Sequence, residues 1–99
     1  MKHIPVPVLP TINTVTKEGI AAKVVDEKYH VFPGTTLTVC CLTMANGFTV
    51  TGEAACAFPE NFKAATGEYY AREAAMNKIW ALEGYLLRQR LSESEGPAG

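Results

Sequence analysis

The 99-residue chain has little of the chemistry that most enzyme active sites need. Serine occurs only as Ser92 and Ser94, near the carboxyl end, so a serine nucleophile in an ordered site is excluded. Asp26 is the only aspartate, and His3 and His30 are the only histidines, neither at a metal-ligand spacing from a cysteine. Neither common glycine-rich phosphate motif is present. The residues therefore predict no catalytic group, no metal and no cofactor.

Charge of one sign and long apolar runs are also missing. Nine Lys and Arg stand against ten Asp and Glu, and the basic residues are not clustered as on a nucleic-acid surface. No run approaches the ~20 apolar residues that a membrane span needs. The amino terminus lacks the apolar core and cleavage site of a secretory signal. We therefore expect a cytoplasmic protein that binds neither a membrane nor nucleic acid.

The length of the chain and its cysteine content indicate its oligomeric state and the redox state of its thiols. A domain of this length buries only roughly 60–65% of the surface that its unfolded chain exposes, so we expect a homo-oligomer. Cys40 and Cys41 would point to opposite faces of a strand, so they do not form a disulfide with each other. The three cysteines are expected to be reduced and packed.

The two ends of the chain differ from the middle. Ile4, Val6 and Val8 alternate with Pro5 and Pro7. Prolines two apart leave the other edge of an extended segment free to pair, so residues 1–13 are predicted to form an edge strand or an arm on another subunit, with these three apolar residues at the interface. Residues 92–99 are predicted to be a disordered tail, which leaves one domain over residues 1–91.

A short amphipathic helix is predicted from Thr14 or Thr16 to Lys28. Either threonine is a suitable N-cap, and Ile20 and Val24 lie at helical spacing with charges opposite.

The next segment has the strongest local signal, a β-hairpin. Residues 36–44 and 48–56 are rich in β-branched and apolar types and flank Asn46-Gly47, the preferred dipeptide of a two-residue type I′ turn. Such a turn would pair Ala45 with Phe48 and divide the hairpin into an apolar face and a mixed face. The mixed face is predicted to be a contact or ligand face, and it carries Leu42, Met44, Thr49, Thr51 and Glu53.

Pro59 is predicted to open a long C-terminal helix, because proline is favoured in the first turn. A narrow stripe at helical spacing is expected to face the core. It consists of Phe62, Ala65, Tyr69, Met76, Trp80 and Leu87.

The candidate binding residues on this helix lie on the stripe or beside it. Arg72 and Glu73 border it, with Asn77 one turn beyond Glu73. Either the two charges form an internal pair, or they line a site in which a ligand completes the pairing. Tyr69 and Trp80 are core aromatics or stacking surfaces for a planar group. Glu53 is an exposed strand carboxylate or a contact to a ligand or subunit.

Several separated motifs resemble a family of small tailed-phage proteins named from gene products of the enterobacterial phages N-four and Sf-six. They are HVFPGTTLTVC at 30–40, NGFTVTGE at 46–53 with Cys56, Asn61-Phe62, and KIWALEGYLL at 78–87. The resemblance covers roughly residues 14–90 and implies a viral origin and the host cytoplasm. The family often carries proline where this chain has Ala81, which implies a straighter helix here. No catalytic residues are implied.

We therefore predict an α+β fold, in which an antiparallel hairpin, extended by an N-terminal edge strand, packs on a long C-terminal helix, with a short N-terminal helix. The leading functional hypothesis is a non-enzymatic phage accessory protein that counters host antiviral defence by sequestering a partner. In its sharper form the partner is a small nucleotide, with Arg72 neutralising phosphate and Tyr69 or Trp80 stacking. The alternative is an inhibitor or structural accessory protein that binds a host protein through the mixed hairpin face.

Overall fold

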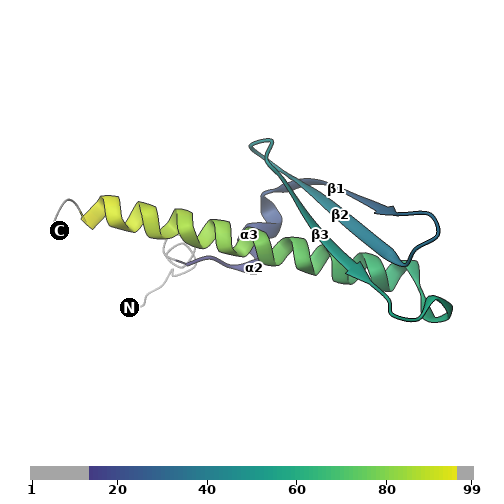
Figure 1. The fold of residues 1–99 in the computed structure, drawn as a ribbon. Helices are drawn as coiled ribbons and strands as arrows, with labels where there is room; N and C mark the ends of the chain where they lie inside the picture. Colours follow the sequence, from purple (N-terminus) through teal and green to yellow (C-terminus); the bar gives the residue numbers. More distant parts are fainter. Residues whose placement is uncertain (1–13, 96–99) are drawn as a thin grey trace, which may run out of the picture.

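The computed structural model describes residues 14–95. A three-stranded antiparallel sheet lies against the first half of a long helix, and a short helix lies beside the middle of that helix (Figure 1). This is the predicted α+β architecture. The elements in chain order are α2 (Lys17–Ala22), β1 (Val24–Val31), β2 (Leu37–Met44), β3 (Thr49–Ala55), the 3-10 turn η1 (Pro59–Asn61) and α3 (Ala64–Glu95).

Helix α2 begins as predicted but ends early. The Thr16 side chain accepts a hydrogen bond of 3.0 Å from the Gly19 N–H and caps the helix. The helix ends at Ala22, and β1 then pairs antiparallel with β2. The prediction of helix through Lys28 was therefore wrong, because the β-branched and aromatic residues of this segment satisfy their backbone groups by pairing with β2.

A three-residue turn joins β2 to β3, where a two-residue turn was predicted. The Met44 N–H donates to the Phe48 carbonyl at 2.8 Å, and the Gly47 N–H donates to the Met44 carbonyl at 2.8 Å. Gly47 has φ +91° but Asn46 does not have a positive φ, so the turn is not type I′. It is a type I turn followed by a glycine bulge, which shifts the strand pairing by one residue.

With this shift the even-numbered residues of β2 join those of β3 on the face that packs on α3. Leu42 and Met44, predicted on a free contact face, are only 0% and 8% exposed and belong to the core. Their placement on a free face of the hairpin was wrong, because the turn has one residue more than predicted. Thr49, Thr51 and Glu53 are exposed on the opposite, uncovered face.

Helix α3 meets the sheet most closely at Gly52. A Cβ atom built there would lie 2.2 Å from the Ala75 nitrogen and 2.3 Å from the Ala71 carbonyl oxygen. Small residues on both elements therefore bring helix and strand backbones into contact. The core around this point consists of Ile20, Cys40, Leu42, Met44, Val50, Ala71, Ala75, Met76 and Ile79.

The buried side of α3 matches the predicted stripe only in part. Met76 is 4% exposed and belongs to the core, as predicted, but Tyr69 and Trp80 are 58% and 45% exposed. The prediction was wrong for these two aromatic residues, because the close approach at Gly52 places the small residues Ala71 and Ala75 against the sheet instead.

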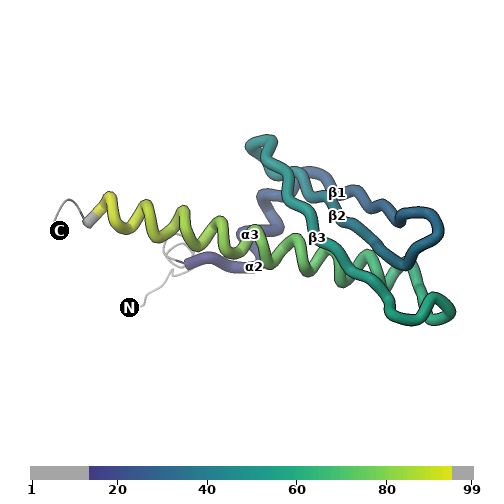
Figure 2. Tube along the Cα trace, viewed as in Figure 1, coloured from purple at the N-terminus to yellow at the C-terminus, as the bar shows by residue number. Residues whose placement is uncertain are grey.

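The ends of α3 also differ from the prediction. Pro59 opens η1, and α3 begins only at Ala64. Ser92, assigned to the tail, lies inside the helix, where the Gln89 side chain donates to the Glu93 carboxylate at 2.9 Å. The second half of α3 extends beyond the sheet (Figures 1 and 2). The predicted N-terminal edge strand, with Ile4, Val6 and Val8, lies outside the described residues, as does the chain after Glu95.

Candidate functional site

Arg72 is held by β1 and not by its neighbour Glu73. Its Nε lies 3.3 Å from Glu27 Oε1, and the Tyr29 hydroxyl donates to the same carboxylate at 2.6 Å. The pair is partly exposed, with 29% of the Arg72 side chain and 41% of the Glu27 side chain open to solvent. Arg72 therefore forms an internal pair with Glu27, 45 residues away, and not the pair with Glu73 that was one of the two alternatives.

The groups behind this pair are poorly suited to catalysis at neutral pH. Burial, together with the hydrogen bond to Glu27, raises the pKa of the Tyr29 phenol above its usual range. Burial also raises the pKa of the Cys40 thiol. Because only the thiolate is a good nucleophile, Cys40 is a packing residue in this environment.

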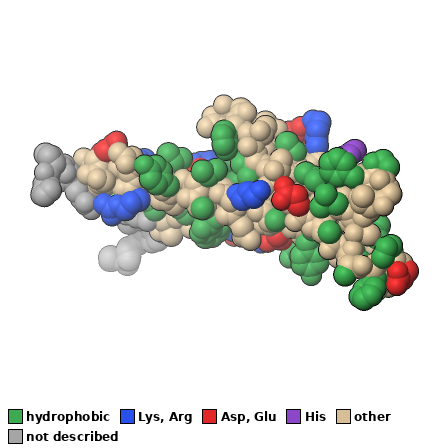
Figure 3. All heavy atoms as spheres, in the orientation of Figure 1, with side chains coloured by type: hydrophobic (Ala, Val, Ile, Leu, Met, Phe, Trp, Pro, Cys, Tyr) green, Lys and Arg blue, Asp and Glu red, His purple; other side chains and the backbone are tan. Residues whose placement is uncertain are grey.

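Four of the predicted binding residues share one face of α3. At about 100° per residue, Tyr69, Glu73, Asn77 and Trp80 fall within one quarter of the helix circumference, beside the buried Met76. Tyr70 borders them, 59% exposed, with its ring 5.1 Å from that of Tyr69 in a T-shaped contact. We call these five residues the outer face. Hydrophobic side chains are exposed along much of the molecule's length (Figure 3).

The outer face does not assemble the predicted nucleotide site. Tyr69 and Trp80 are eleven positions apart, which is about 16 Å along the helix axis. One base therefore cannot stack between both rings. A phosphate at Arg72 would also have to compete with the Glu27 carboxylate.

Glu53 lies apart from the other candidates. It is on β3, and its carboxylate is 4.0 Å from the Lys78 ammonium and 3.4 Å from the Thr51 hydroxyl. The side chain is half exposed, so its pairing with Lys78 is weak.

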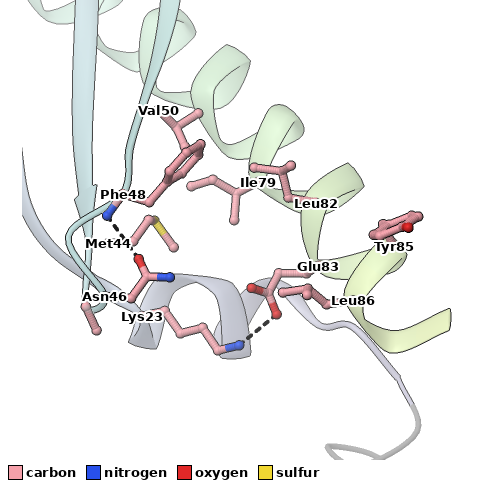
Figure 4. Close-up of a pocket in the computed structure, with 11 residues that line it drawn as sticks. Lys23, Met44, Asn46, Phe48, Val50, Ile79, Leu82, Glu83, Tyr85 and Leu86 are labelled. Atoms are coloured by element: carbon pink, nitrogen blue, oxygen red, sulfur yellow. Dashed lines mark hydrogen bonds and ion pairs between the residues drawn. The ribbon is translucent and has the colours of Figure 1, made fainter. Parts of the chain in front are cut away.

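An apolar groove that the sequence reasoning missed lies between the hairpin tip and the second half of α3. Phe48 forms one wall and Leu82 and Leu86 form the other (Figure 4). Its volume is about 470 Å³. An ion pair between Lys23 and Glu83, 2.7 Å long, closes one side. We call this the tip groove. The i, i+4 spacing of Leu82 and Leu86 indicates one wall of this groove in the sequence. The opposite wall is predictable only when the geometry of the hairpin turn is known.

Within residues 14–95, no group of three or more His, Cys, Asp or Glu side chains is arranged to hold a metal ion. The helices of this same region include none that is long and apolar enough to cross a membrane.

Comparison with known proteins agrees with the motifs. No curated protein and no solved structure matches the chain. A family model does match, over residues 15–91, which covers α2, the whole sheet and nearly all of α3. The chain belongs to the phage protein family described as N4 Gp49/phage Sf6 gene 66.

Proposed function

We propose that this phage protein is a non-enzymatic accessory protein that acts in the host cytoplasm, and that it counters host defence by binding and sequestering a host protein. The outer face of α3 is the binding surface. The observation that carries this proposal is the exposure of three aromatic side chains, Tyr69, Tyr70 and Trp80, on one side of a helix whose other side packs on the sheet.

The composition of the outer face favours a protein partner. Tyr and Trp are enriched among the residues that contribute most to protein–protein affinity, since each combines a large apolar area with a polar atom. Glu73 and Asn77 add hydrogen-bonding groups between the rings, so the surface has an apolar part with polar groups beside it. A rigid helix also presents these side chains at low entropic cost.

A small nucleotide is the weaker alternative. Phosphate recognition needs a cation that is available to the ligand, and Arg72 already pairs with Glu27. The aromatic side chains are too widely spaced along α3 to enclose one base from both sides. The surface is better suited to the side chains of an extended partner.

Affinity capture from host lysate tests the proposal. The bait is the full chain, and the test variant is the double substitution Tyr69→Ala, Trp80→Ala. Thr51→Ala, on the uncovered face of the sheet, is the matched control. We expect the wild type and the control to retain the same host protein, and the double variant to bind it at least about 30-fold more weakly, as for truncated hot-spot residues.

Titration calorimetry with cyclic and linear nucleotides completes the test. We expect no heat of binding with any of them. The proposal is overturned if the double variant captures the same protein as well as the wild type does. It is also overturned if a nucleotide binds and Arg72→Ala abolishes that binding.

A further inference from the structure

A second surface, distinct from the outer face, is the tip groove, whose exposed side chains come from two elements. Phe48 at the end of the hairpin is 56% exposed. On α3, Leu82, Tyr85 and Leu86 are 45%, 71% and 46% exposed. All four line the groove, and Leu82, Leu86 and Phe48 point into it (Figure 4).

We propose that the tip groove is the interface of a two-fold symmetric homodimer, in which the second half of α3 of each copy lies in the groove of the other. Leu82, Tyr85 and Leu86 follow the i, i+3, i+4 spacing of a helix that binds in an apolar groove. The same helix is also one wall of the groove. A two-fold interface requires a self-complementary surface, and this helix supplies both the insert and the receiving wall.

The exposed area of the groove is sufficient for a dimer. The exposed parts of these four side chains and of Lys23, Ala45 and Asn46, which also line the groove, amount to on the order of 600 Å². Two copies together bring the buried area to about the 1,200 Å² at which stable interfaces begin. The apolar centre and the Lys23–Glu83 ion pair at the edge also match the usual anatomy of such interfaces.

The length of α3 favours this occupant over a small molecule. Helices in proteins gain most of their stability from packing of an apolar face, and the second half of α3 extends beyond the sheet. A second copy packs along this whole overhang, whereas a small molecule in the groove covers only a part of it. Three of the polar side chains in the lining are already engaged, since Lys23 pairs with Glu83 and Asn46 accepts a hydrogen bond from the Phe48 N–H, so they offer little to a small polar ligand.

Sedimentation analysis of the full chain tests the proposal. The monomer mass is 10.7 kDa, so the wild type is expected at twice that value. Leu86→Asp places a charge inside the interface and is expected to give monomers. Phe48→Asp does the same from the other wall, at an exposed turn residue whose substitution leaves the core intact. Tyr69→Asp, on the outer face, is the control and is expected to remain dimeric.

Far-UV circular dichroism identifies any variant that fails to fold. If one groove variant does not fold, the sedimentation of the other groove variant tests the proposal. A wild type that sediments as a monomer overturns the proposal. A dimer that survives both groove substitutions, or that Tyr69→Asp dissociates, also overturns it, because the interface then lies elsewhere.

Discussion

The close approach of α3 to β3 makes Gly52 the position most sensitive to a single methyl group. In Gly52→Ala the new Cβ would lie 2.2 Å from the Ala75 nitrogen and 2.3 Å from the Ala71 oxygen. This is about 1 Å short of an ordinary van der Waals contact, and both neighbours are backbone atoms that cannot rotate away. Helix α3 must therefore move off the sheet. A gap of that size forfeits a quarter to a half of each contact across the interface.

We expect Gly52→Ala to lower the free energy of unfolding by about 3 kcal/mol or more, above the usual range for one added methyl group. Urea unfolding followed by circular dichroism measures it. Gly84→Ala is the matched control, because no atom lies within 4 Å of the Cβ that it would add. It should raise stability by about 0.5–1 kcal/mol through helix propensity. A Gly52→Ala protein within 0.5 kcal/mol of the wild type would refute this packing.

Three further predictions concern the turn, the buried acids and the ion pair. Gly47→Ala should cost about 1–2 kcal/mol in urea unfolding because φ is +91° there, and an unchanged midpoint would contradict the turn geometry. Folding raises the pKa of the Tyr29 phenol and of the Cys40 thiol. These groups contribute their full stability below their unfolded-state pKa values, so the free energy of unfolding should fall as pH rises beyond about 9. Urea titrations from pH 7 to 10.5 check this, and Cys40→Ala should weaken the dependence. A double-mutant cycle of Arg72→Ala with Glu27→Gln should give a coupling of about 0.5–1 kcal/mol, and zero coupling would leave Arg72 available for other partners.

The sequence predicted the fold class because its strongest signals are local. The Asn46-Gly47 dipeptide between two β-branched runs indicated the hairpin, and the two threonines Thr14 and Thr16 indicated the start of α2, where Thr16 is the cap. These signals do not determine the length of the turn, since the same dipeptide also forms a three-residue turn with a glycine bulge. β1 was missed because its pairing partner is β2, and local periodicity does not contain that contact.

The sequence predicted where several of the candidate residues lie on α3, but not how they sit relative to the sheet. Tyr69, Glu73, Asn77 and Trp80 do share a face of α3, since helical spacing alone decides that. The position of this face relative to the sheet was not predictable, because it depends on Gly52. The partner of Arg72 likewise lies on a strand that the sequence assigned to a helix.

Trp80 offers the most direct test of the central claim, that the outer face of α3 binds the partner, because it is the only tryptophan in the chain. Acrylamide quenching of its fluorescence therefore reports on this face alone. We expect efficient quenching in the protein by itself, including its dimer, since Trp80 is 45% exposed and lies outside the lining of the tip groove. Addition of the captured host protein should then protect Trp80. Unchanged quenching in that complex would contradict the account.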